Sequence, residues 1–169
     1  MTQLGLPVWS QLGRHRFRAH SWSLHAKLTV STVVVLILGG WALFAWFEWT
    51  NPETLGQLSA WDSTINSFFH SVTPRTAGFN SVDMASLREP SRLLTEVLMF
   101  IGGGSASTAG GIKVTTFAVL GWVMWAEARG DPDVVVFERR IPETAQRQAL
   151  TVALLAIGVV IGATMLLRA

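Results

Sequence analysis

Four consecutive residues, Thr76, Ala77, Gly78 and Phe79, have the composition of a backbone-lined ion filter. The carbonyl oxygens of such a loop can point toward a common axis and replace the hydration shell of a monovalent cation. Gly78 makes this geometry accessible, because a residue without a Cβ adopts backbone angles that other residues resist. The loop, residues 75–80, lies between long apolar segments and is too short to form an element of its own. It therefore predicts passage of a monovalent cation across a membrane, with the four backbone carbonyls contacting the ion.

A second candidate site is the run of glycine and small polar residues at 102–111, which interrupts the apolar segment 90–128. Glycine in a helix costs about 1 kcal/mol relative to alanine, so this run predicts a broken helix. Broken helices of this kind are typical of the ion path in transport proteins. A phosphate loop is excluded, because Ile112 separates Gly111 from Lys113. The candidate gate residues are Gly102, Gly103, Gly104, Gly110, Gly111 and Lys113.

Two basic residues, Lys113 and Arg75, lie close to these sites in sequence. An ionisable residue inside a membrane segment is costly, so Lys113 is a functional candidate that tunes the gate, either by repelling cations or by pairing with a carboxylate. Glu96 is the nearest such carboxylate in sequence. The alternative, in which Lys113 reaches the cytoplasmic interface, requires it to span about 20–25 Å along a straight helix. Arg75 precedes the filter and is interpreted as a structural brace, because a cation aimed at the ion would repel it.

The composition indicates a membrane protein. Half of the residues are hydrophobic and 14% are charged, against about 25% charged in soluble domains. Eight tryptophans and no tyrosine fit a chain whose aromatic rings lie at the membrane interface. The absence of cysteine excludes disulfides and thiolate metal sites. No metal-binding cluster of His, Asp and Glu and no catalytic triad is evident, so we expect no enzymatic activity.

The elements that must position the two sites follow from hydropathy and helix-breaking residues. Residues 1–27 are basic and predict a cytoplasmic segment. Residues 28–49 predict a membrane helix that runs from inside to outside. Residues 60–73 predict a short re-entrant pore helix, ended by Pro74, that leads into the filter at 75–80. The alternative for this short helix is an extracellular loop with an amphipathic surface helix.

The remaining part of the chain contains a polar segment and a second apolar run. Residues 129–148 are interpreted as a cytoplasmic connection, and residues 149–169 as one further membrane helix. Because the sequence stops at the tip of this apolar run, we expect the chain to be a fragment.

Residues 72–80 and 102–116 resemble the filter and the intramembrane gating loop of the Trk/Ktr potassium-uptake family, whose membrane subunits are of the TrkH and KtrB kind. The two motifs occur in the family's order and at about its spacing. The resemblance extends from about residue 4 to 167. Residues 28–128 are similar to the third membrane–pore–membrane repeat of the family, and residues 149–167 to the opening helix of the fourth.

This resemblance implies an all-α, multi-pass protein of the cell (plasma) membrane, in which four repeats in one subunit surround one pore. It also implies a homodimer in membrane lipid, a cytosolic nucleotide-binding regulatory subunit, and K⁺ as the transported ion, with Na⁺ or H⁺ coupling (symport) as options. No covalent cofactor and no nucleic acid partner are expected. One repeat holds one filter strand of four, so the expected function is potassium transport as part of a pore-forming subunit. The alternative is a non-conducting membrane scaffold or assembly subunit.

Overall fold

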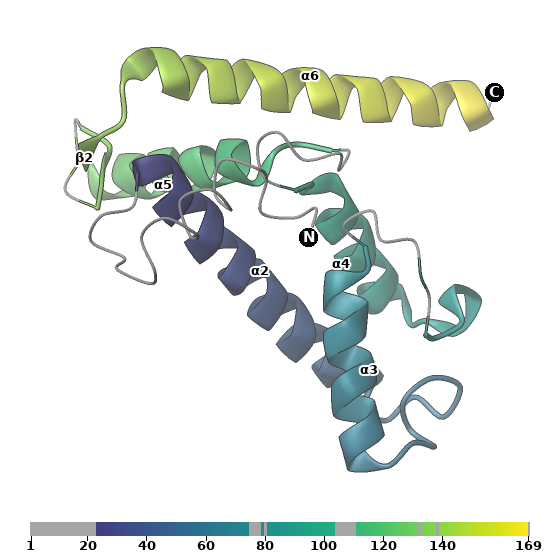
Figure 1. The fold of residues 1–169 in the computed structure, drawn as a ribbon. Helices are drawn as coiled ribbons and strands as arrows, with labels where there is room; N and C mark the ends of the chain where they lie inside the picture. Colours follow the sequence, from purple (N-terminus) through teal and green to yellow (C-terminus); the bar gives the residue numbers. More distant parts are fainter. Residues whose placement is uncertain are drawn as a thin grey trace.

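The computed structural model describes residues 23–74, 79, 81–103, 111–131, 133–137 and 139–168. This part of the chain is mostly helical, as expected for an all-α protein (Figure 1). A 3-10 turn and a pair of two-residue strands complete the described elements. The elements are α2 (Leu24–Glu48), α3 (Ala60–Val72), η2 (Met84–Ser86), α4 (Glu89–Phe100), α5 (Val114–Arg129), β1 (Val135–Val136), β2 (Arg139–Arg140) and α6 (Glu143–Arg168).

Helix α2 is the central helix of the described structure, because α3, α4 and α5 all pack against it. Helix α6 instead packs on α5 (Figure 1). It begins at Leu24, before the expected start at residue 28. The reason is a cap: the Ser23 hydroxyl accepts the backbone N–H of Ala26 at 3.2 Å and satisfies a free donor of the first turn. Helices α2 and α6 are each long and apolar enough to cross a membrane.

Helix α3 has clear start and stop signals. The Ser59 side chain accepts the backbone N–H of Asp62 at 3.1 Å, while its own hydroxyl donates to the Asp62 carboxylate at 2.7 Å. The last helical bond runs from the Thr73 N–H to the Phe69 carbonyl at 3.0 Å. Pro74 follows and brings no N–H with which to continue the helix. The helix therefore ends immediately before the predicted filter.

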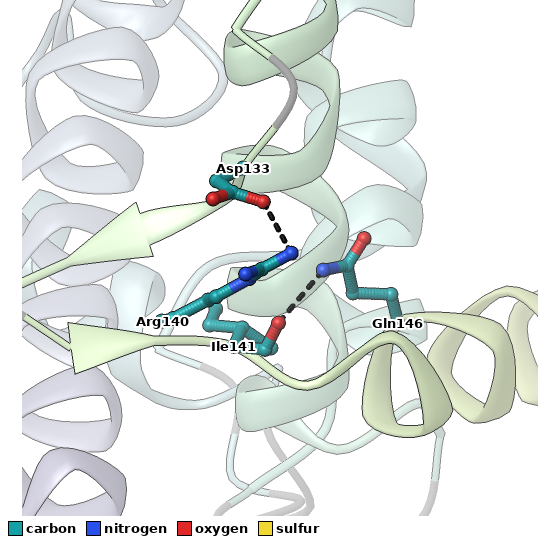
Figure 2. A network of polar contacts seen from close by, with 4 residues as sticks. All are labelled: Asp133, Arg140, Ile141 and Gln146. Carbon is teal, nitrogen blue, oxygen red and sulfur yellow. Dashed lines mark hydrogen bonds and ion pairs between the residues drawn. The ribbon is translucent and has the colours of Figure 1, made fainter.

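A short hairpin connects α5 to α6. Helix α5 ends at Arg129, and the following Gly130 has a φ of 72°, the left-handed conformation favoured after a helix. Beyond it, Val135 pairs with Arg140 in the antiparallel β1–β2 hairpin. Figure 2 shows Arg140 turned toward Asp133, with their charged atoms 2.5 Å apart.

Helix α6 begins at Glu143, earlier than the expected start at residue 149. Polar residues that form helices readily precede its apolar run, and hydropathy alone does not detect them. The Gln146 side chain donates to the Ile141 carbonyl at 2.8 Å, which ties the first turn of α6 to the end of the hairpin (Figure 2).

Three apolar clusters lie along α2, and each contains one buried residue of this helix. One joins the start of α2 to α5 and the hairpin, the second joins its middle to the break between α4 and α5, and the third joins its end to the following loops. The clusters are Leu28, Ala118, Ala126, Val134, Val136 and Ile141; Val33, Ile101 and Val114; and Phe44, Leu55 and Leu87.

Candidate ion pathway

Of the predicted filter residues, Thr76, Ala77 and Gly78 lie outside the described residues, together with Arg75. Phe79 is described, and 72% of its surface is exposed. The structure therefore describes the elements that flank the predicted filter and, of the predicted filter itself, only Phe79. Thr73 and Pro74, the last residues before it, are both buried.

The last turns of α3 and α4 converge on one residue of α2, Gly40. A Cβ placed on Gly40 would lie 3.1 Å from Leu98 Cδ1 and 3.4 Å from Ser71 Cβ. Ser71 belongs to the last turn of α3, and Leu98 belongs to the last turn of α4. Since glycine brings no side chain, both helix ends approach the α2 backbone closely. The helices that precede the predicted filter and the predicted gate thus both end close to Gly40.

A polar contact joins the buried faces of α3 and α4. His70 Nε2 lies 3.0 Å from Thr95 Oγ1, and both residues are buried. The Thr95 hydroxyl already donates to the Ser91 carbonyl at 2.7 Å, so its oxygen accepts the N–H of His70. The His70 ring also stacks on Phe44 of α2, with centroids 3.9 Å apart and an interplanar angle of 21°. His70 is therefore held by both neighbouring helices.

A fully buried carboxylate, Glu48, ends α2 and accepts hydrogen bonds from two segments, the loop after α2 and the start of α4. Its Oε2 accepts hydrogen bonds from Asn51 Nδ2 and Thr54 Oγ1, each at 2.6 Å. Its Oε1 accepts the backbone N–H of Arg88 at 2.9 Å and the hydroxyl of Ser91. A buried charge is tolerated only when its lone pairs are satisfied in this way. Glu48 thereby joins the end of α2 to the start of α4.

Arg88 completes this junction from the other side. Its guanidinium donates to the Phe47 carbonyl at 3.0 Å and to Thr50 Oγ1 at 3.2 Å, which caps the end of α2. Arg88 is also the residue before α4 and brings no side-chain cap to its own helix. Neither Glu48 nor Arg88 is a candidate from sequence. The available signal was the position of Glu48 directly at the end of an apolar helix. From hydropathy alone, a carboxylate at such a position is expected at the membrane–water interface and exposed to solvent.

The chain between α4 and α5 is closed at its base by a backbone clasp, which we define as residues 100–103 and 111–114. Ile101 and Ile112 form a parallel bridge. The bridge consists of Gly102 N–H to the Ile112 carbonyl at 2.8 Å and Ile112 N–H to the Phe100 carbonyl at 2.9 Å, and Val114 N–H adds a bond to the Gly103 carbonyl at 3.2 Å. Because the bridge is parallel, the backbone at Ile101 and the backbone at Ile112 run side by side in the same direction.

The clasp depends on Gly111. Its φ is +76°, and a Cβ there would lie 2.5 Å from the Phe100 carbonyl oxygen. Only glycine fits both conditions. Of the other predicted gate glycines, Gly102 and Gly103 are buried within the clasp. Gly104 and Gly110 lie outside the described residues.

Lys113 belongs to the clasp and is the residue that precedes α5. Its side chain is half-buried, whereas Glu96, the nearest carboxylate in sequence, is exposed on α4. Among the residues that the structure describes, no group of three or more His, Cys, Asp or Glu side chains could hold a metal ion.

Residues 13–168 match the model of a protein family described as TrkH, cation transport protein. The chain belongs to the TrkH family. This membership confirms the resemblance seen in the two glycine-containing motifs. The family's description is that of a transporter.

Several curated relatives carry potassium transport in their names. The chain is 42% identical to Ktr system potassium uptake protein B of Bacillus subtilis, over 93% of its own length and 35% of that relative's. It is also 42% identical to the protein of the same name from Vibrio alginolyticus, over 82% of the chain and 30% of that relative. Its identity to potassium/sodium uptake protein NtpJ of Enterococcus hirae is 38%, over 97% of the chain and 36% of that relative. The chain thus spans about a third of the length of these relatives.

Proposed function

We propose that this chain forms part of the pore-forming subunit of a potassium-uptake system in the cell membrane. The carbonyls of Thr76, Ala77, Gly78 and Phe79 would line one strand of its filter. The observation that carries the proposal is the convergence of the α3 and α4 ends at Gly40, because both candidate sites begin there. Membership of the TrkH family and the names of the relatives support the same ion class.

Helix α3 has the properties required of a pore helix. Its 13 residues extend about 20 Å, too short to cross a hydrocarbon core of about 30 Å. The carboxyl end of a helix carries about half a negative charge, and in α3 this end directly precedes the predicted filter in sequence. Helix α4 ends near the same point, so a second partial negative charge adds to the attraction for a cation.

The proposed gate is the segment 102–111, tuned by Lys113. The clasp holds both ends of this segment, so that a rearrangement between them leaves α4 and α5 in place. Lys113, whose half-buried side chain belongs to the clasp, would set the electrostatic barrier that a cation meets there.

One filter strand cannot surround an ion, so the pore requires further repeats of the same subunit. A homodimer, a cytosolic nucleotide-binding regulatory subunit and coupling to Na⁺ or H⁺ belong to the same proposal. A preference for K⁺ over Na⁺ also belongs to the proposal and needs its own measurement, because one relative is named for potassium alone and another for both ions. The second candidate function is a non-conducting membrane scaffold.

Uptake of K⁺ and Rb⁺ by a transport-deficient bacterial strain tests the proposal. The protein is expressed from its complete reading frame, as wild type and as Gly78→Ser. We expect the wild type to restore growth at low K⁺ and the substitution to abolish uptake or its preference for K⁺. Gly158→Ser is the matched control, because open space surrounds Gly158 of α6. Normal uptake by Gly78→Ser would refute the filter assignment, and absence of uptake by the wild type would favour the scaffold.

A further inference from the structure

A continuous set of hydrogen bonds runs from the pore-helix candidate α3 to the end of α2. His70 donates to Thr95, and Thr95 donates to the carbonyl of Ser91. The hydroxyl of Ser91 donates to Glu48. Each of these four side chains is at most 3% exposed. The set therefore lies in the interior formed by α2, α3 and α4.

The location of this set distinguishes it from a general stabilising contact. His70 belongs to the last turn of α3, one turn before Pro74. At its far end, Glu48 is fixed by Asn51, Thr54 and the Arg88 backbone. The end of α3 is thus connected to Glu48, whose carboxylate accepts four hydrogen bonds.

Simple packing would not need these polar groups. Buried polar pairs are often no more stabilising than apolar residues of the same volume, but they require one particular geometry to satisfy their donors and acceptors. An apolar contact at Thr95 would let α3 slide against α4, whereas the His70 hydrogen bond fixes their relative height.

We propose that His70, Thr95, Ser91 and Glu48 are positioning residues that set the ion preference of the filter. They hold the last turn of α3, from which the filter loop departs. Discrimination between K⁺ and Na⁺ by carbonyl oxygens depends on the positions and number of those oxygens. A loosened α3 end lets the loop adapt to either ion, so preference falls before transport is lost. This inference rests on the proposed transport function.

The test compares two substitutions of Thr95 in the protein expressed from its complete reading frame. Thr95→Val keeps the shape and removes the hydroxyl, whereas Thr95→Ser keeps the hydroxyl. The measured quantities are the apparent KM values for K⁺ and Na⁺ uptake and the amount of protein in the membrane. Thr64→Val is the control, because Thr64 on α3 makes the same bond within its helix, to the Ala60 carbonyl at 2.8 Å, and is more exposed.

We expect Thr95→Val to reduce the ratio of KM for Na⁺ to KM for K⁺ about fivefold, because His70 loses its buried acceptor in addition to the loss of the Thr95 bond to the Ser91 carbonyl. Thr95→Ser and Thr64→Val should keep the wild-type ratio. An unchanged ratio in Thr95→Val at normal abundance would overturn the inference, as would an equal change in Thr95→Ser.

Ser91→Ala is a second variant, for use if Thr95→Val does not accumulate in the membrane. It removes the hydrogen bond from Ser91 to Glu48 and changes the side-chain volume less. It should change the ratio in the same direction, and a wild-type ratio would overturn the inference. Failure of the underlying function is distinguishable, because the wild type itself would then take up neither ion. A wild type that transports and prefers K⁺, with variants that match it, would refute the positioning role alone.

Discussion

Glu48 and Arg88 cap each other's helices across 40 residues of sequence. The Glu48 carboxylate accepts the Arg88 N–H at the start of α4, and the Arg88 guanidinium covers the free carbonyl of Phe47 at the end of α2. Helix ends leave unpaired donors and acceptors, and here two helices satisfy each other's. The arrangement fixes where α4 starts relative to α2.

Replacing Glu48 with Gln should reduce the free energy of unfolding by about 2–3 kcal/mol. The amide lacks the charge and presents an N–H₂ group to donors, so at least one buried partner loses its acceptor. Thermal unfolding of the detergent-solubilised protein measures the effect. Glu53→Gln is the control, because Glu53 lies in the loop that follows α2 and is exposed. Equal stability of the two variants would contradict the buried role of Glu48.

Gly111→Ala should destabilise the protein by about 2 kcal/mol or more. The added methyl group meets the Phe100 carbonyl oxygen, and the positive φ is unfavourable for alanine. Gly121→Ala in α5 has open space around it and should stabilise the helix by up to about 1 kcal/mol. Chemical denaturation of both variants compares them directly. A harmless Gly111→Ala would show that the clasp does not form.

Gly40→Val tests the convergence of α3 and α4 on α2. The valine would press against Leu98 and Ser71, and overpacking of this kind costs about 1–3 kcal/mol. A Cβ on the neighbouring Gly39 would meet no atom within 4 Å, so Gly39→Val should cost less. The difference between the two melting temperatures is the measurement. Equal losses would show that the close approach is absent.

Lys113→Ala should raise the open-state flux of K⁺, because it removes a positive charge beside the proposed gate. Partial deletion of residues 102–111 should act in the same direction. Rb⁺ influx at saturating external concentration measures both. Lys27→Ala, a lysine near the start of α2, is the control and should leave flux unchanged. Unchanged flux in Lys113→Ala would contradict a gating role for this residue.

Local sequence patterns predicted most of the helices but not the contacts between them. The two long apolar runs, the break marked by glycines and the stop at Pro74 all depend on neighbouring residues. The first turn of α2 depends on the Ser23 cap, and the first turn of α6 consists of polar helix formers, so hydropathy placed both starts too late.

The contacts of the candidate site could not be predicted from sequence for a different reason. Glu48 and Ser91 are 43 residues apart, and His70 and Thr95 are 25 apart. No periodicity links such pairs, because only the packing of α3 and α4 on α2 brings them together. The clasp likewise pairs Ile101 with Ile112 through backbone atoms, which carry no residue-specific signal.

The parallel bridge at Ile101 and Ile112 has a consequence for how members of this family can diverge. The bonds at the base define the spacing of α4 and α5 without reference to the residues enclosed between them. Lengthening a segment whose two ends are fixed in this way carries only a small entropic cost. The length of the enclosed segment can therefore vary while the spacing between α4 and α5 is kept.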